Sequence, residues 1–284
     1  MLSKVASGVA GMLLLSAPLR ADLIWANDAR GNTSHIEEFD TATGALVTSF
    51  LAPNPDAAGQ IGRGIAVVGS SIYYSVDNSG DVFLTNPTGV DLGVAFDTGL
   101  PGIASIASDG QFLYVTPTNG SVAVNETVLK YSLTGSLLGT LTLTPSGGPS
   151  GALGRTGLEV AGNDFIANQG NNEGPYDEFD SSGALLMAAF LNLPGFGFTG
   201  VAFNGSTYFV SDEEAAPSTL RLFNSSGGSL GSVTLTGCPG PNQQCDLQDL
   251  SLAVSAVPEP STVALLAVAI LGISMFRRRN ARRA

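Results

Sequence analysis

The chain has 284 residues, enough for one or two domains, and carries a formal net charge of −12. Seven of its twelve basic residues lie near the two ends, so between Asp22 and Ala256 five basic residues stand against 23 acidic ones, a net charge of about −18. A body this acidic repels a phosphate backbone, and no basic stripe interrupts it, which excludes nucleic acid as a partner.

Residues 1–21, MLSKVASGVAGMLLLSAPLRA, have the features of a secretory signal peptide. Lys4 lies in a short basic start, an apolar stretch runs from about Val5 to Ala17, and Ala21 is a small residue suited to cleavage. The alternative is a buried first helix, but the chain turns at once to the strand-like DLIWAND. We expect the mature chain to begin near Asp22.

A repeat organises the rest of the chain. The segment EFDTATGALVTSF at 38–50 returns as EFDSSGALLMAAF at 178–190, and weaker relatives occupy 81–96, 128–143 and 220–235. Each consists of two apolar runs around a turn, the pattern of a β-hairpin. The turn glycines, which lie 45 to 48 residues apart, are Gly44, Gly89, Gly135, Gly183 and Gly228. A period in the forties indicates a repeat array.

Four of these hairpins follow a second pair of apolar runs, which begin at Gly64, Gly102, Gly157 and Gly200. Four strands in about 46 residues correspond to one blade of a β-propeller. DLIWAND alone precedes the first hairpin, and an orphan run, DLSLAVS at 249–255, follows the last one. We therefore predict an all-β fold with one propeller at 22–256, whose five four-stranded blades close by pairing of the terminal strands. An open β-solenoid is the alternative, although it leaves the complementary fragments unexplained.

The body resembles the broad group of secreted propellers built from short repeats with a glycine before the inner strand and a glycine in the hairpin. That resemblance covers nearly the whole body and implies a propeller fold. It does not select a function, because such scaffolds include lectins, lyases, glycosidases and pure interaction modules.

The two cysteines, Cys238 and Cys245, lie in the loop-like stretch GCPGPNQQC. In an exported chain, an even pair at this separation predicts a disulfide rather than a metal site. The sole histidine, His35, has no second histidine or nearby cysteine, so the usual zinc sites lack ligands.

Polar loops are expected after the second strand of each repeat, where a propeller gathers equivalent loops on one face. Their hard oxygen ligands suit calcium or a sugar, and the set is Asp28, Asp77, Glu173, Asp212, Glu213 and Glu214 with Asn27, Asn78, Asn119, Asn168 and Asn171. The metal candidates are Asp28, Asp77, Asp212 and Glu213. No cofactor is required. The alternative is that these residues serve only as turn formers.

The C-terminal segment 257–284 has three parts. Val257, Pro258, Glu259, Pro260 and Ser261 are followed by an uncharged run to Phe276 and then by a basic cluster of Arg277, Arg278, Arg279, Arg282 and Arg283. This segment resembles a PEP-CTERM sorting signal, which implies an exosortase-like processing enzyme as a partner.

The physical properties of this tail agree with that resemblance. Sixteen helical residues span roughly 24 Å, which crosses the membrane with local thinning and snorkelling arginines. We therefore expect a short transmembrane helix with its arginines in the cytoplasm and the body outside, released later to the outer surface or extracellular matrix. A plain permanent anchor is the alternative.

Catalytic motifs are scarce, because nucleophilic triads need a base that this chain does not supply. Glu159 is the one weak catalytic candidate, since it interrupts an apolar inner strand where sister repeats have Ala66, Ala104 and Ala202. The alternative interpretation of Glu159 is a solvated residue that lines the central channel. We favour a non-enzymatic cell-surface or extracellular-matrix protein, sorted by an exosortase-type system, whose propeller is a binding or structural module. Its expected partner is a polysaccharide or a matrix protein. The alternative is a glycosidase or lyase acting on exopolysaccharide with paired carboxylates.

Overall fold

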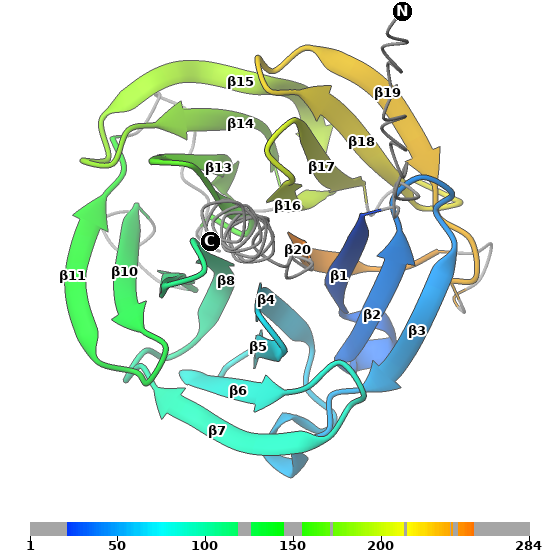
Figure 1. The fold of residues 1–284 in the computed structure, drawn as a ribbon, viewed down its shortest axis with the longest axis vertical. Coiled ribbons are helices and arrows are strands. Elements are labelled where there is room, and N and C mark those ends of the chain that lie inside the picture. The colour runs from blue at the N-terminus through cyan, green and yellow to red at the C-terminus, as the bar shows by residue number, and fades with distance from the viewer. Residues whose placement is uncertain are drawn as a thin grey trace, which may run out of the picture.

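A computed structural model of the chain describes residues 22–118, 126–144, 155–170, 173–212, 215–238, 240 and 244–252. Five four-stranded antiparallel sheets stand around a central axis (Figure 1). The fold is therefore the five-bladed β-propeller that the repeat predicts.

In each blade the strands run in order from the axis to the periphery. The first blade contains β20 (Leu247–Leu252), β1 (Leu23–Asp28), β2 (His35–Asp40) and β3 (Leu46–Leu51). The second contains β4 (Gly62–Val68), β5 (Ser71–Val76), β6 (Asp81–Thr85) and β7 (Asp91–Asp97). The third contains β8 (Ile103–Ser108), β9 (Phe112–Pro117), β10 (Thr127–Ser132) and β11 (Leu137–Thr142).

The last two blades follow the same order. The fourth contains β12 (Leu158–Ala161), β13 (Asp164–Gly170), β14 (Glu173–Phe179) and β15 (Leu185–Phe196). The fifth contains β16 (Phe198–Phe203), β17 (Thr207–Asp212), β18 (Thr219–Asn224) and β19 (Ser229–Thr234). Short 3₁₀ turns occur at η1 (Arg30–Asn32) and η2 (Pro55–Ala57).

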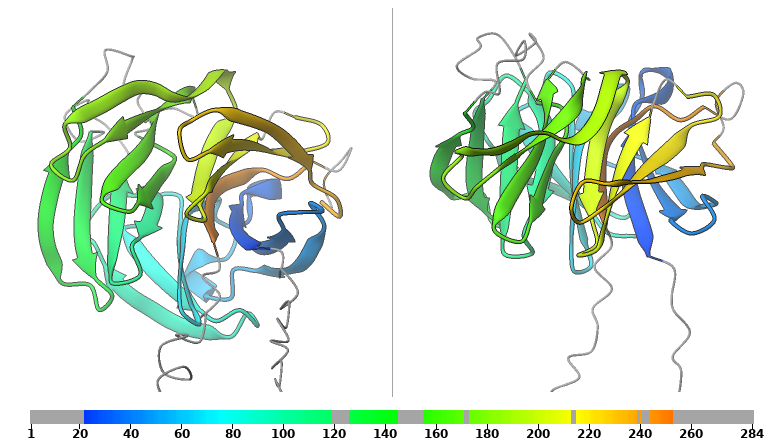
Figure 2. Two further views of the ribbon diagram at one scale, coloured as in Figure 1. Left: turned by 45° about the horizontal axis from the view of Figure 1, so that its top comes forward. Right: turned by 90° about the horizontal axis from the view of Figure 1, so that it is seen from above.

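The ring closes through the two ends of the body. β20 pairs antiparallel with β1, so that Ile24 lies opposite Leu252 and Asn27 opposite Asp249. The predicted pairing of terminal strands is confirmed, and the open solenoid is excluded. The register places the start of β1 beside the end of β20, so β1 begins and β20 ends at the same face of the disc (Figure 2).

The hydrophobic core is divided among the gaps between blades. Each of the five clusters of buried side chains joins two neighbouring blades; Trp25 and Ile36 of the first blade, for example, pack with Ile65 and Tyr74 of the second. Full burial of one such aliphatic or aromatic side chain stabilises the fold by roughly 1.5–3 kcal/mol. Since all five clusters and all five sheets are formed between residues 23 and 252, this segment contains everything that closes the ring.

The inner strands approach one another so closely that glycine is required. A Cβ at Gly64 would lie 2.7 Å from the backbone nitrogen of Ile106 in the next blade, and a Cβ at Gly200 would lie 2.7 Å from that of Leu250. This contact explains why a glycine opens most of the inner runs in the sequence.

The hairpin turns between the two outermost strands also depend on glycine. Gly44, Gly89, Gly135 and Gly183 have φ between 71° and 86°, the left-handed region that favours glycine. In the fifth blade this residue is Gly227, with φ 76°, and not the predicted Gly228. Because SSGGS contains two adjacent glycines, the spacing of the repeats does not distinguish Gly227 from Gly228.

The loop that connects the fifth blade to β20 is cross-linked. Cys238 and Cys245 form the predicted disulfide, with an S–S distance of 2.07 Å, and both are buried between the fifth and first blades. The predicted C-terminal hydrophobic helix and the leader both lie outside the described residues. Among the residues that the structure describes, no helix is long and apolar enough to cross a membrane.

Candidate functional site

Asp249 on β20 reaches across the axis of the ring. Its Oδ2 accepts hydrogen bonds from the backbone N–H of Ile65 (3.1 Å), from the N–H of Ile106 (3.1 Å) and from the hydroxyl of Ser105 (2.8 Å). One carboxylate of the first blade therefore holds the inner strands of the second and third blades. Burial raises the pKa of Asp249 well above its usual range.

Ser251, two residues further along β20, repeats this contact with the second blade. Its hydroxyl oxygen accepts a hydrogen bond from the backbone N–H of Val67 at 2.9 Å. The inner edge of β4 would otherwise present unpaired backbone groups to the axis. The polar side chains of β20 thus provide hydrogen-bond acceptors for backbone N–H groups of β4.

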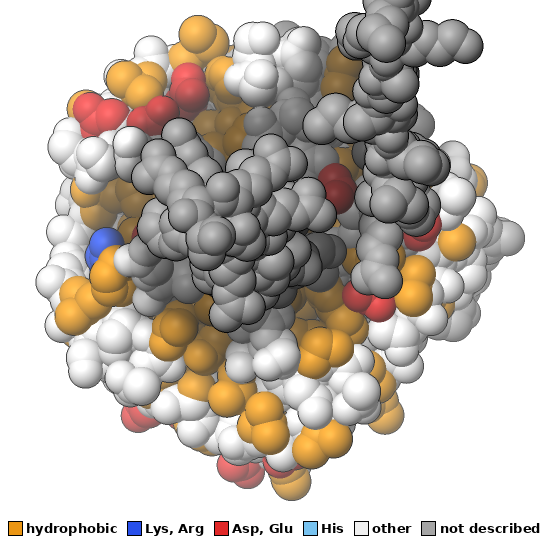
Figure 3. Space-filling view, in the orientation of Figure 1, with side chains coloured by type: hydrophobic (Ala, Val, Ile, Leu, Met, Phe, Trp, Pro, Cys, Tyr) orange, Lys and Arg blue, Asp and Glu red, His pale blue; other side chains and the backbone are white. Residues whose placement is uncertain are grey.

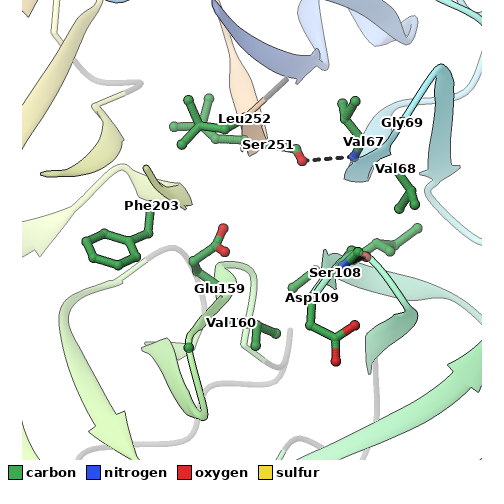
Figure 4. Close-up of a pocket in the computed structure, with 15 residues that line it drawn as sticks. Val67, Val68, Gly69, Ser108, Asp109, Glu159, Val160, Phe203, Ser251 and Leu252 are labelled. Carbon is green, nitrogen blue, oxygen red and sulfur yellow. Dashed lines mark hydrogen bonds between the residues drawn. The ribbon is translucent and has the colours of Figure 1, made fainter. Parts of the chain in front are cut away.

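A pocket of about 490 Å³ opens at the end of the axis where the inner strands turn back into the second strands (Figure 4). All five blades contribute to its walls, which are formed largely by Val67, Val68, Val160, Phe203, Leu250 and Leu252 with Glu159. This is also the face at which β1 begins and β20 ends. The pocket is mainly apolar with one inward carboxyl.

Glu159 on β12 lies opposite Ile166 and points into this pocket (Figure 4). Strand pairing assigns the equivalent positions in the other blades to Ala66, Ala107, Ala202 and Ser251. The predicted equivalent Ala104 is therefore wrong by three residues. The error arises because GIASIAS contains the Ile-Ala pair twice, three residues apart.

The environment of Glu159 differs from that of an exposed glutamate. Burial raises its pKa well above the usual range, and the carboxyl of Asp249 adds to that increase, whereas a hydrogen bond with the backbone of Val160 opposes it. A raised pKa of this kind is the property required of a carboxyl that acts as a general acid. Asp109, at the edge of the same pocket, accepts hydrogen bonds from its own turn and from the Tyr114 hydroxyl at 2.8 Å.

The opposite face carries the polar ends of the second strands, where metal ligands were predicted. Each candidate carboxylate whose side chain the structure describes has an arginine partner: Asp28 lies 3.3 Å from Arg30, Asp77 lies 3.5 Å from Arg63, and Asp212 lies 2.7 Å from Arg221. The arginines divide these carboxylates into separate ion pairs. Calcium binding here stays a prediction.

The remaining predicted ligands fall into three groups. Glu213, Glu214, Asn119 and Asn171 lie outside the described residues, and of Glu173 only the strand position is described. Asn78 lies in the turn after β5 and donates a hydrogen bond to Asp77. Asn27 and Asn168 are fully buried on their strands and do not face a loop ligand.

Those two asparagines link neighbouring blades. The side-chain amide of Asn27 donates to the carbonyls of Gly64 (3.1 Å) and Ser75 (2.9 Å) in the second blade. That of Asn168 donates to the carbonyl of Phe198 in the fifth blade at 3.3 Å. Ser75, Thr116 and Ser211 occupy corresponding buried positions, so a layer of polar contacts runs through the ring near its loop face.

Sequence reasoning did not identify a buried ionic cluster of Asp28, Arg30 and Glu37. Arg30 lies 3.1 Å from Glu37 and 3.3 Å from Asp28, and both carboxyls are buried. Burial, together with the charge of Asp28, raises the pKa of Glu37 to about 7. The adjacent glutamates in HIEEFD were the available signal, because neighbouring residues of a strand point to opposite faces and a strand that packs on both faces turns both side chains toward the interior.

A metal ion does not fit this cluster well. Cys245 lies close to Asp28 and Glu37, but its sulfur is in the disulfide and is therefore not a thiolate ligand. The guanidinium of Arg30 already supplies the positive charge.

These observations place the body in the class of five-bladed β-propellers. The family model for the PEP-CTERM protein-sorting motif matches residues 256–279, so the chain carries that motif beyond its propeller. The motif implies an exported protein with a membrane-anchored C-terminal sorting signal that an exosortase-type enzyme processes.

One solved structure supports the propeller fold. The chain is similar to one in the crystal structure of a nidogen/laminin complex, with 11% identity, a TM-score of 0.53 and coverage of 82% of this chain and 98% of that one. It is also similar to Myxococcus xanthus glutaminyl cyclase, with 12% identity, a TM-score of 0.46 and coverage of 74% and 92%. A search among curated proteins finds no match.

Proposed function

We propose that the protein is a non-enzymatic component of the cell surface or extracellular matrix, in which the propeller is a binding or structural module. The observation that carries this proposal is the use of the polar groups at the axis. Asp249 and Ser251 are engaged in holding inner strands together. Groups engaged in this way are not free to act on a ligand at the axis.

The test uses residues 22–256, which include every strand of the closed ring. This segment is screened on a glycan array and incubated with a panel of bacterial exopolysaccharides. We expect binding to a polysaccharide, or to a matrix protein in a parallel screen, without release of reducing ends or unsaturated products. Turnover of any polysaccharide would contradict the proposal.

A glycosidase or lyase is the second candidate, and Glu159 is the observation that favours it. Glu159 is the one acidic residue among five equivalent inner-strand positions, it faces the pocket, and burial raises its pKa. If this candidate holds, Glu159→Gln abolishes turnover while Glu178→Gln, on β14 of the same blade, retains it. Equal activity of both variants would eliminate Glu159 as the acid.

The final location is also part of the proposal. The motif at 256–279 implies export, and we propose that the processed body reaches the outer surface or the matrix. Fractionation of the producing cells with an antibody against the propeller tests this, and retention of all protein in the inner membrane would contradict it.

A further inference from the structure

Exposed apolar side chains are concentrated at the periphery of the disc. All ten exposed large hydrophobic residues that the structure describes lie on the outermost strand of a blade or directly before it, with exposed fractions of 44–60%. They are Val47, Leu51, Val90, Leu92, Val94, Leu137, Leu138, Leu186, Met187 and Leu230. Figure 3 shows hydrophobic side chains around this periphery. We define the rim as β3, β7, β11, β15 and β19.

Every rim strand is also a sheet edge. Each is the last strand of its sheet, so its outer backbone groups have no partner strand among the described residues. Natural sheets protect such edges with charges, short strands or β-bulges, and each rim strand has at least one bulge or irregularity against its neighbour. Here β3, β11, β15 and β19 contain no charged residue, and β7 has aspartates only at its two ends.

Three rim strands share a Leu-Gly pair: Leu92–Gly93, Leu138–Gly139 and Leu230–Gly231. The leucines are 50–57% exposed, and nothing lies within 4 Å of the place where a Cβ on each glycine would stand. Each pair lies at a β-bulge of its strand and presents an exposed apolar side chain beside accessible backbone, and the strand residues that follow the pair continue the edge to which a further strand can add.

Charge determines which partner fits this rim. The body carries about −18, and the five basic side chains inside it are already engaged, four in ion pairs and Lys130 over the ring of Phe112 at 3.8 Å. Two copies therefore repel each other wherever acidic faces meet, and the nearly uncharged rim is the surface on which this repulsion is smallest.

We propose that the rim is a self-association surface through which a second copy of this chain joins edge to edge by β-strand pairing. This inference rests on the proposed structural role and makes it more specific. Five edges on one ring allow each copy to contact several others, as a component of an extended matrix requires.

Sedimentation velocity of residues 22–256 over a range of concentrations tests the proposal. We expect concentration-dependent oligomers that become more abundant when salt rises from about 0.1 M to about 0.5 M, because salt screens the repulsion between acidic bodies. The rim variant Leu92→Lys, Leu138→Lys, Leu230→Lys should need at least a tenfold higher concentration for half-association.

The matched control is Ser70→Lys, Gln111→Lys, Asn163→Lys, which adds the same three charges at exposed turns of the inner hairpins. It should associate as readily as the wild type. A rim variant with serine at the same three leucines serves if the lysine variant does not give a cooperative melting curve.

Two results would overturn the proposal: a body that stays monomeric at high salt, or rim and control variants that associate alike. The proposed function fails differently. A monomeric body that still binds a polysaccharide without turnover removes only the self-association, whereas turnover removes the non-enzymatic role.

Discussion

Asp249 is a buried carboxyl whose hydrogen bonds all come from the protein, three of them to one oxygen and from two other blades. Asp249 follows the fifth blade in the chain and lies on β20, the strand that closes the ring. Its side chain therefore stabilises the closed ring and not one sheet alone.

We predict that Asp249→Ala lowers the free energy of unfolding by at least about 2 kcal/mol, because a buried donor left without an acceptor costs roughly 1–3 kcal/mol. Asp249→Asn should lose less than half as much, since its amide oxygen can occupy the position of Oδ2. Urea denaturation measures both. The exposed Asp56→Ala is the control, and an alanine variant as stable as this control would show that the axial bonds contribute little.

Glu37 makes stability depend on pH. Its pKa is raised from 4.5 to about 7, so the folded state binds a proton that the unfolded state has released. The corresponding stabilisation is complete below pH 4.5 and is lost as the pH rises through 7, with an upper limit of about 3 kcal/mol.

We therefore predict that the free energy of unfolding falls more steeply between pH 5 and pH 8 in the wild type than in Glu37→Gln. Urea denaturation at each pH gives the two curves. The pKa values of Asp28 and Asp249 are raised too, so the difference between the curves, not the wild-type slope, isolates Glu37. Parallel curves would contradict the prediction.

Sequence reasoning located several site residues without their partners. Asp28 and Asp212 were expected at the ends of second strands and do lie there, but Arg221 reaches Asp212 from the neighbouring strand. Such pairs depend on cross-strand register and side-chain reach. Composition and spacing contain neither, so the same carboxylates were interpreted as available metal ligands.

Among the strands, β20 contributes to ring closure through both its backbone and its side chains. It pairs with β1, and through Asp249 and Ser251 it also binds β4 and β8. Removing it deletes an inner strand and exposes the backbone edge of β1.

Deletion of residues 249–255 should accordingly abolish cooperative unfolding of the body. Circular dichroism during heating follows the change. A chain that ends at residue 256 is the control and should melt as a folded propeller. If the shorter chain melts at the same temperature as the control, the closing pair is not required for stability.

The repeat was sufficient to predict five blades and their closure, because each blade repeats the same order of turns and apolar runs. It was insufficient for register within a strand. GIASIAS fits the inner-strand pattern at two positions, and the contact of Ile106 with Asp249, which comes from another blade, selects one of them. Glu159 was found because it breaks the pattern, although its pocket depends on all five blades.

At the scale of the molecule, the propeller and the sorting tail are separated by a short connection. Eight residues lie between Leu252 and Ser261, so the nine Cα–Cα steps that join them reach at most about 32 Å when extended. The connection leaves the ring at the face with the 490 Å³ pocket, so that face lies within this reach of the start of the apolar run.

We predict that the exported protein lacks the arginine cluster, because the PEP-CTERM motif implies removal of the tail by an exosortase-type enzyme. Mass spectrometry of the protein recovered outside the cytoplasm should place its new C-terminus near Pro260. Deletion of the processing enzyme should leave the full tail in place. An intact Ala284 on the exported form would support a permanent anchor instead.

The attachment of the tail to an inner strand has a mechanical consequence. A pull on the anchored tail acts at Leu252 along the direction of β20, whereas the hydrogen bonds to β1 lie across that direction. The load is then shared by the whole ladder in shear, with the bonds from Asp249 and Ser251 in parallel. A tail joined to an outermost strand and pulled outward would instead peel its bonds one after another, so this topology lets the tether bear force before the ring opens.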